Sequence, residues 1–413
     1  SAFLNGVLNE EIYMNCPGGM EGATEDDALL LLKSLYGLVQ SARVYFKTFK
    51  NAMDKMGFQQ SEMDPCLFMK EGKEGYYTYL AVWVDDCLII GKEEDIQSTL
   101  TEFQKHFNIQ TKETLDDYLS CEIILNKEAG SIWIGQPDMV KKIESKFGEW
   151  VSSSKSTTTP GPPHTGIIRP KDEEPKLNRD DQSRYRSGVG ALLFLVKYSR
   201  PDLANAVREL SKCMTDANEA AEKVLKRVLK FVIDTKDYGL KMIPNKMTER
   251  DIEWDMVAYT DADWAGDKES RTSVTGFIIF LLGCAITWKS KQQSSVSLSS
   301  AESEYYALSE AAREIKFIVQ LLEDMKISVK RPVTCRVDNV GAMFMAENIT
   351  TSQRSKHIDI RARFVTKMLD NKELEIIFVK SEENLADGFT KNTSEKTYSE
   401  HTRTYISERS EST

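Results

Sequence analysis

The stretch WDMVAYTD, residues 254–261, decides the fold of the C-terminal third of this 413-residue chain. Apolar residues alternate with their neighbours from Trp254 towards Thr260, which is the period of a β-strand, and the strand ends at Asp261. A carboxylate at a strand end projects into a cleft and not into the core. The following sequence predicts more strands, a long helix, a strand, a helix, and then another strand and helix, which is an α/β domain.

Three further carboxylates fall at the ends of predicted elements in the same third. Ser299 and Glu302 form a capping box that opens the long helix, and helical spacing places Glu304 in line with its apolar face. Asp338 ends an alternating strand, and Asp387 falls near a helix start. Each residue alone is more often a cap or a turn acid, so only the set is informative.

These four carboxylates have the composition of a metal centre. Glu304 lies where the core stripe meets the cleft, and burying a lone carboxylate there costs several kcal/mol unless it finds a partner. Four acidic side chains can hold two Mg²⁺ ions about 4 Å apart, one activating water and one stabilising a leaving 3′-oxygen. The sequence therefore predicts a divalent-metal site in this domain.

A series of motifs surrounds the carboxylates in a fixed order: DADWAG at 261–266, RTS at 271–273, GF at 276–277, WKSKQQ at 288–293, EYYA at 304–307, VDN at 337–339, KHIDIR at 356–361 and AD at 386–387. The series resembles ribonuclease H in its copia-type retrotransposon form. That resemblance implies four catalytic, metal-binding residues with Mg²⁺ or Mn²⁺ as cofactor: Asp261, Glu304, Asp338 and Asp387.

Two other polar residues of these motifs have weaker assignments. Asp263 is better interpreted as a local loop ligand than as a catalytic residue. His357 either contacts a phosphate of the nucleic acid, helps the product to leave, or is a hydrogen-bonded structural histidine.

A second pair of carboxylates lies near the start of the chain. Two apolar, β-prone runs at 77–84 and 87–91 flank Asp85 and Asp86, which predicts a hairpin with both acids at its tip. Acidic oxygens in such a place can hold the Mg²⁺ ions that polymerases need. Asp is also a common turn residue, so the dipeptide alone is weak evidence.

The neighbouring motifs strengthen the polymerase interpretation: AFLNG at 2–6, EIYM at 11–14, LYGLVQS at 35–41, AVWVDD at 81–86 and YLSCEI at 118–123. This series resembles the reverse transcriptase of copia-type retrotransposons. The resemblance implies a palm on an antiparallel sheet, with Asp85 and Asp86 as catalytic metal ligands. It also implies that Phe3 and Gln40 line the nucleotide site and that 118–123 grips the primer end.

The chain departs from that family in three places. Trp83 replaces a Tyr, and Ser120 replaces a Gly. The family's other metal-binding Asp precedes the AFLNG motif by four residues, which would place it before Ser1. We therefore expect a fragment that does not polymerise DNA unaided.

A basic helix is predicted between the two groups of motifs. Its cations recur at helical spacing beside apolar residues, and they are nucleic-acid-binding candidates: Lys223, Lys226, Arg227 and Lys230. A solvated helix face and a backbone-binding surface explain this stripe about equally well.

Composition bounds the remaining possibilities. The net charge of -10 argues against a basic field over the whole chain, so any nucleic-acid binding depends on local patches. The 7 cysteines form no CxxC pair, which argues against a disulfide framework and fits a reducing compartment. The longest apolar stretch, around 277–288, is too short to span a bilayer.

The resulting prediction is a multidomain protein of α/β and α+β class. Its predicted parts are a reverse transcriptase palm and thumb-like region at 1–150, a linker at 151–181, a helical connection at 182–250, a ribonuclease H-like α/β domain at 251–392 and a flexible tail at 393–413. The linker is assigned because its Ser, Thr, Pro and charged residues bury little apolar surface.

The predicted function is that of a retrotransposon reverse transcriptase and ribonuclease H fragment. The partners implied by the resemblance are an RNA template, an RNA–DNA hybrid, deoxynucleotides, and the integrase and Gag of the same element, in a cytoplasmic virus-like particle with a nuclear phase. The alternatives are a cellular ribonuclease H, which the polymerase motifs disfavour, and a decayed or domesticated copy that binds nucleic acid without catalysis. The four carboxylates disfavour the latter modestly.

Overall fold

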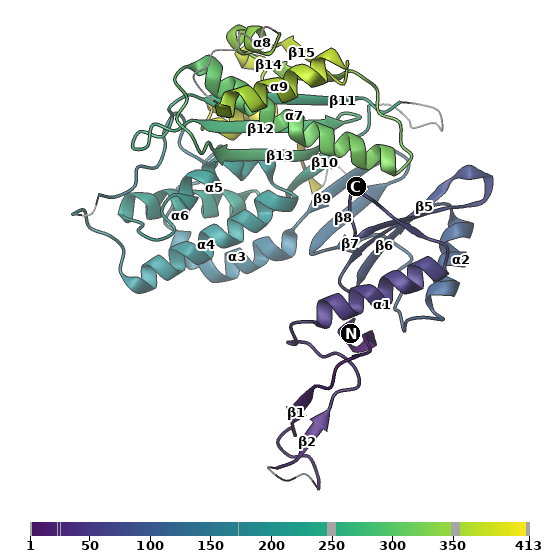
Figure 1. Ribbon diagram of the computed structural model, residues 1–413. Coiled ribbons are helices and arrows are strands. Elements are labelled where there is room, and N and C mark those ends of the chain that lie inside the picture. Colours follow the sequence, from purple (N-terminus) through teal and green to yellow (C-terminus); the bar gives the residue numbers. More distant parts are fainter. Residues whose placement is uncertain are drawn as a thin grey trace. The chain divides into compact units, whose positions relative to one another are not determined.

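The chain forms two compact units, Ser1–Thr114 and Leu115–Thr413, which are described separately (Figure 1). The computed structural model describes residues 2–22, 24, 26–171, 173–245, 253–347 and 356–409, without the side chains of 356–360 and 362. The boundary between the units lies before the hairpin and helix at 121–151, which sequence analysis had placed in the first part. Among the described residues, no helix combines the length and the apolar character needed to cross a membrane.

The first unit contains a four-stranded antiparallel sheet and two helices. Its elements are η1 (Phe3–Asn5), β1 (Tyr13–Asn15), β2 (Ala28–Leu30), α1 (Ser41–Lys55), β3 (Gln59–Gln60), β4 (Leu67–Glu71), η2 (Lys73–Gly75), β5 (Tyr77–Trp83), β6 (Asp86–Ile90) and α2 (Glu93–Phe103). The strand order is β3-β4-β5-β6. Phe49 of α1, Phe68 of β4 and Phe103 of α2 pack in one core. The predicted β5–β6 hairpin is confirmed, since Trp83 pairs with Asp86 across the turn.

The second unit begins with an antiparallel sheet whose strands are far apart in the sequence. The strands are β7 (Asp117–Tyr118), β8 (Cys121–Asn126), β9 (Ser131–Gly135), β10 (Tyr238–Met242) and β16 (Ile406–Glu408), in the order β16-β10-β9-β8-β7. Trp133 is buried beneath β10, and its Nε1 donates to the carbonyl of Ser407 at 3.2 Å. Gly239 makes room for this indole, because a Cβ there would lie 2.4 Å from it.

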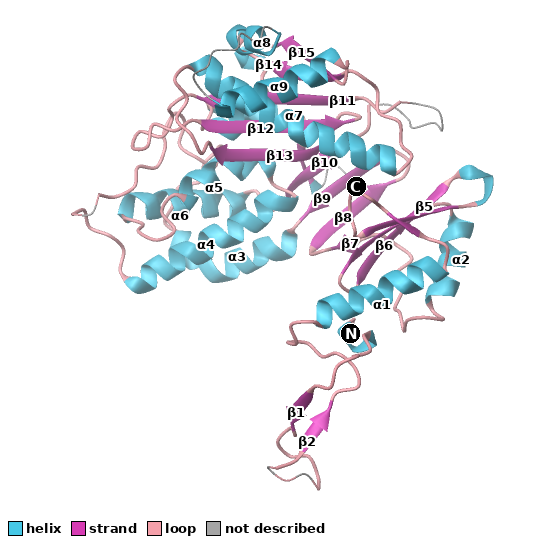
Figure 2. Cartoon of the chain, viewed as in Figure 1, coloured by secondary structure: helices cyan, strands magenta, loops and turns pink. Residues whose placement is uncertain are grey.

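Helices form a separate layer of the second unit (Figure 2). They are α3 (Pro137–Val151), α4 (Arg179–Tyr198), η3 (Pro201–Leu203), α5 (Ala204–Ser211) and α6 (Glu219–Asp234). Phe147 of α3, Leu192 of α4 and Leu225 of α6 share one buried core. The helical connection predicted at 182–250 overlaps α4, α5 and α6.

The segment between α3 and α4 packs against these helices, although its composition predicted a linker. Arg227 of α6 donates to the carbonyls of Thr159 at 3.1 Å and Pro160 at 3.2 Å. Further on, the amide of Ile167 donates to a carboxylate oxygen of Glu209 at 2.6 Å. Amino-acid composition indicates how much apolar surface a segment can bury. This segment is instead held by hydrogen bonds of its backbone groups, which composition does not reveal.

The predicted α/β domain is confirmed and has a five-stranded mixed sheet. Its elements are β11 (Met256–Asp263), β12 (Val274–Leu281), β13 (Cys284–Gln292), α7 (Ser300–Asp324), β14 (Val333–Val337), α8 (Val340–Glu347), α9 (Lys356–Asp370), β15 (Leu374–Phe378), η4 (Ser381–Glu383) and α10 (Asp387–Thr390). The strand order is β13-β12-β11-β14-β15, with β11, β14 and β15 mutually parallel. Ser299 caps α7 as expected, its Oγ accepting from the amide of Glu302.

Residues 393–409 are ordered, and the expectation of a flexible tail is wrong for them. They form α11 (Glu395–Thr402) and β16, which pairs with β10. Tyr398 of α11 donates to Asp202 at 2.9 Å, and Asp202 also pairs with the buried Arg200 at 2.8 Å. The polar composition of this segment does not predict these contacts, because they consist of one hydrogen bond from a tyrosine hydroxyl and the pairing of a strand of three residues.

The turn between β7 and β8 holds residues in a conformation that favours glycine. Leu119 has a φ of 50° and Ser120 a φ of 65°. Holding a residue that has a Cβ in this left-handed region costs roughly 1–2 kcal/mol. A glycine avoids this steric cost and loses only roughly 0.5–1 kcal/mol more backbone entropy on folding than alanine does. We expect Ser120→Gly to raise the free energy of unfolding by roughly 0.5–1 kcal/mol in urea titrations. The same change at Ser152, where φ is -57°, should lower it, and equal effects at both positions would contradict this account.

Candidate metal centre

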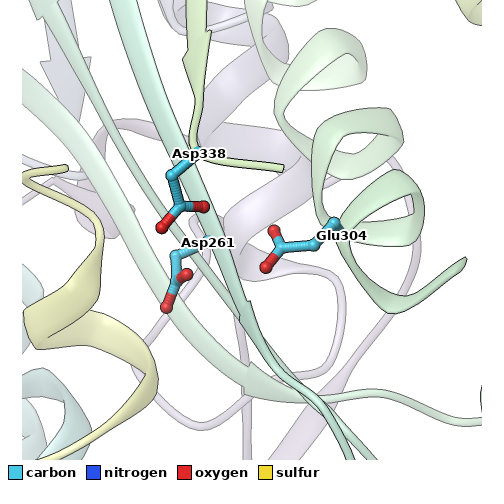
Figure 3. A group of neighbouring side chains, drawn as sticks. All are labelled: Asp261, Glu304 and Asp338. Atoms are coloured by element: carbon cyan, nitrogen blue, oxygen red, sulfur yellow. The ribbon is translucent and has the colours of Figure 1, made fainter. Parts of the chain in front are cut away.

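Three of the four predicted nuclease carboxylates come together in the second unit. One oxygen from each of Asp261, Glu304 and Asp338 lies within 4.8 Å of the others, and Figure 3 shows the side chains pointing towards one another. Asp261 lies on β11 and Asp338 follows β14, the parallel neighbour of β11. Parallel strands end at the same sheet edge, which brings these two acids side by side. Glu304 reaches the same edge from the first turns of α7.

The fourth predicted carboxylate is buried close by but has a different partner. Asp387 begins α10, and its Oδ1 lies 2.8 Å from Nζ of Lys391 one helical turn later. Asp387 and Asp338 interact electrostatically, so the two acids belong to one charged region. The structure therefore places a lysine among the four predicted carboxylates.

Two residues that sequence reasoning left without a role attach α10 to the site. The hydroxyl of Thr390 donates to the carboxylate of Asp261. Asn384 donates from its side chain to the carbonyl of Thr260 at 2.8 Å. Lys391 was also missed, although its spacing of four from Asp387 predicts contact if a helix starts there.

The electrostatics of the three-carboxylate cluster favour a bound cation. Burial raises the pKa of Asp261, and repulsion from Asp387 adds to this effect against the pull of Lys391. Burial likewise raises the pKa of Glu304, with further repulsion from Asp261 and Asp338. The buried Oε2 of Glu304 has no hydrogen-bond partner among the described residues. Carboxylate oxygens are the ligands that Mg²⁺ prefers, so this donor set fits a divalent ion that would supply the missing partner.

The raised pKa values predict a particular pH dependence of stability. Without metal, the folded state retains protons on Asp261 and Glu304 that the unfolded chain loses above about pH 4. Stability in EDTA should therefore fall as the pH rises from 5 to 9. The double variant Asp261→Asn/Glu304→Gln cannot acquire these charges and should lose less stability over that range.

Thermal unfolding at several pH values, with EDTA or with Mg²⁺, measures this difference. Mg²⁺ should stabilise the wild type increasingly as the pH rises and leave the double variant unchanged. A pH dependence in EDTA that is the same for both proteins would contradict the raised pKa values.

The polymerase candidates lie in the first unit. Asp85 occupies the β5–β6 turn and Asp86 begins β6, while Val84 in the turn has a φ of 57°. A positive φ at a β-branched residue is strained, and such strain is found mainly at functional sites. Among the residues that the structure describes, Asp85 and Asp86 are not part of any cluster of three potential metal ligands.

The two nucleotide-site candidates lie beside the same α1 helix. The ring of Phe3 lies 4.6 Å from that of Tyr36 and 6.0 Å from that of Tyr45 between centroids. Gln40 immediately precedes α1. Burial raises the pKa of Tyr45, and the nearby Cys87 and Asp85 raise it further. Phe3 and Asp85 thus both lie near Tyr45.

The basic stripe of α6 is partly occupied by contacts within the chain. Lys226 lies over the ring of Trp150, and Lys230 pairs with Asp234. Arg227 holds the 159–160 backbone, as described above, whereas Lys223 is exposed. The structure favours a structural role for Arg227. The side chain of His357, the other nucleic-acid candidate, lies outside the described residues.

Comparisons with known proteins agree with both groups of motifs. The reverse transcriptase (RNA-dependent DNA polymerase) family matches residues 1–161. The retrovirus-related Pol polyprotein from transposon TNT 1-94 of Nicotiana tabacum is 30% identical over 396 residues. This match covers 95% of the chain but only 29% of the relative, so the chain spans less than a third of that polyprotein.

Two solved structures are similar at low identity. The foamy viral protease-reverse transcriptase in complex with RNA/DNA hybrid is 9% identical, with a TM-score of 0.45, covering 92% of this chain and 45% of that one. LC11-RNase H1 in complex with RNA/DNA hybrid is 16% identical, with a TM-score of 0.26, covering 34% of this chain and 97% of that one.

Proposed function

We propose that the second unit of this chain, which belongs to the Pol polyproteins of copia-type retrotransposons as a reverse transcriptase-containing fragment, hydrolyses the RNA strand of RNA–DNA hybrids. The observation that carries this proposal is the cluster of the buried Asp261 and Glu304 with the half-buried Asp338, in which one oxygen of Glu304 lacks a hydrogen-bond partner among the described residues. Such a cluster is destabilising for the fold unless it binds a cation.

The residues of the site would divide the work as follows. Asp261, Glu304 and Asp338 would hold divalent metal, with Asp387 completing the set from α10. The metal supplies an activated water and stabilises the leaving 3′-oxygen. Thr390 orients the carboxylate of Asp261 through its hydroxyl. Lys391, paired with Asp387, offsets part of the negative charge before metal binds.

Substrate recognition should depend on the shape of the hybrid and not on its sequence. A-form duplexes are recognised through their 2′-hydroxyls and phosphates. Because the net charge is -10, contacts to the phosphates would depend on individual residues. The exposed Lys223 is one candidate and His357 is another. Asp263 remains a loop residue in this proposal.

We propose a separate, polymerase role for the first unit within the longer polyprotein. Asp85 and Asp86 would bind Mg²⁺, and Phe3 and Gln40 would contact the deoxynucleotide. The hairpin geometry and the strained turn at Val84 support this assignment. The RNA template, the integrase and Gag of the same element, and assembly in a cytoplasmic particle are further proposals that follow from the family.

Asp338→Asn tests the nuclease proposal, since it removes a metal ligand and its charge but keeps the shape of the side chain. Hybrid cleavage in Mg²⁺ or Mn²⁺ should fall at least ~100-fold, and Mn²⁺ binding measured by calorimetry should weaken. Asp370→Asn, at the exposed end of α9, is the matched control and should leave both unchanged. Equal cleavage by Asp338→Asn and wild type would exclude this site, and a wild type that binds hybrid without cleaving it would favour the non-catalytic alternative.

A further inference from the structure

Helix α5 presents a buried network of charges to the loop that follows β11. The side chain of Lys212, next to the end of α5, is only 7% exposed and bridges two carboxylates. Its Nζ lies 2.9 Å from Oε1 of Glu209 and 3.0 Å from Oδ2 of Asp267. Arg208 approaches the same Glu209 at 2.6 Å. A buried lysine must have such partners, because the cost of removing its charge from water is high.

Asp267 uses its other oxygen to organise the loop between β11 and β12. Its Oδ1 accepts from the amides of Glu269 at 3.2 Å and Ser270 at 2.8 Å, and from the hydroxyl of Ser270 at 2.9 Å. Burial would raise the pKa of this carboxyl, but the hydrogen bonds from Ser270 and Lys212 outweigh burial and lower it to about 2. The loop is therefore organised around a carboxylate that Lys212 attaches to α5.

Hydrogen bonds connect this loop to Gln293, and connect Gln293 to the first turn of α7. The hydroxyl of Ser273 accepts from the amide of Ala265 at 3.0 Å, and its carbonyl accepts from the amide of Gln293 at 2.8 Å. The side chain of Gln293 then donates to the carbonyl of Ser303 at 3.0 Å. Ser303 precedes Glu304, so this chain of contacts runs from Lys212 to the carboxylate that α7 supplies.

A second connection leads back to β11 through Asp263. Asp263 interacts electrostatically with Lys391, Arg208 and Lys212. Its carboxylate packs on Gly266, where an added Cβ would lie 1.9 Å from Oδ2. Asp263 follows Asp261 by two residues on β11, so the α5 cations act on the strand that carries one proposed metal ligand.

We propose that Lys212, acting through Asp267, is a positioning residue for the nuclease carboxylates. This inference rests on the proposed nuclease function. The helical layer at 179–234 is then part of the active enzyme and not only a spacer between two activities. Residues that orient metal ligands from a second layer affect metal affinity and turnover, typically by about 10–100-fold.

The experiment compares three lysine variants in the full chain. Lys212→Met keeps the length of the side chain but removes the charge, and Lys212→Arg keeps the charge. Lys141→Met is the matched control, because Lys141 has no assigned role and pairs with Asp138 on α3 of the same helical layer. Thermal unfolding, Mn²⁺ binding by calorimetry, and kcat and KM for a hybrid substrate are measured for each.

Lys212→Met should weaken Mn²⁺ binding and lower kcat by about tenfold or more, with a smaller effect on KM. Lys212→Arg should recover most of both. Adding Asp267→Asn to Lys212→Met should cost little more, because residues that act through one contact are not additive. A purely structural lysine would lower the unfolding temperature but leave Mn²⁺ affinity and kcat of the folded protein unchanged.

The outcomes separate the two levels of inference. Cleavage and Mn²⁺ affinity equal to wild type in Lys212→Met, or a loss no larger than in Lys141→Met, would overturn the positioning role and leave the nuclease proposal intact. An additive loss in the double variant would also overturn it, since Lys212 and Asp267 would then act independently. A wild type that neither binds Mn²⁺ nor cleaves hybrid would overturn the nuclease function, and the positioning role with it.

Discussion

Mutual repulsion among the buried carboxylates at the edge of the β11–β14 pair is the constraint on which the second unit depends. Asp261 and Glu304 cannot both be charged at low cost in this setting, because burial raises the pKa of each and Asp261 raises that of Glu304 further. Some compensating charge or proton must be present whenever the domain is folded. Lys391 supplies one positive charge on the α10 side. A metal ion would supply the remainder, so folding and metal binding would be coupled here.

The same electrostatic problem recurs where the helical layer meets α11, and there each charge has a partner. Arg200 and Asp202 are both almost fully buried and are paired at 2.8 Å, with Tyr398 and Thr235 completing their hydrogen bonds. A buried pair of this kind adds little net stability compared with apolar residues, yet removing one partner is strongly destabilising. The Arg200–Asp202 pair therefore specifies how the helical layer and α11 pack, and adds little to the stability of that packing. The Lys212–Asp267 pair fits the same description.

Sequence reasoning predicted the parts of this structure that depend on periodicity. The β5–β6 hairpin, α7 and its cap at Ser299, and the parallel strand ends with Asp261 and Asp338 all follow from local patterns. The metal-centre hypothesis followed because acids at strand ends of one sheet must approach one another. The pairing of Asp387 with Lys391 was not predicted, because this ion pair depends on where the very short helix α10 begins.

Sequence reasoning failed where a segment is held by polar contacts with distant residues. The stretch around Thr159 and Pro160 is too polar to suggest packing, and its attachment to Arg227 involves carbonyl groups that every sequence has. The segment at 393–409 was misinterpreted for the same reason. The role of Lys212 had no signal either, because a lysine after a helix is ordinarily solvated, and only its 7% exposure reveals the buried pair.

The pairing of β16 with β10 has a consequence for how the nuclease site is completed. Trp133 on β9 bonds to Ser407 on β16 across a sequence separation of 274 residues. Contacts so distant in sequence carry a loop-closure cost and tend to form late in folding. Asp387 and Thr390 precede β16 on the same segment, and Phe389 between them packs against Tyr405. The edge of the carboxylate site that α10 contributes should therefore form together with the sheet of β7–β10 and β16. The proposed metal ligands and the residues that close the second unit would then belong to one cooperative structure.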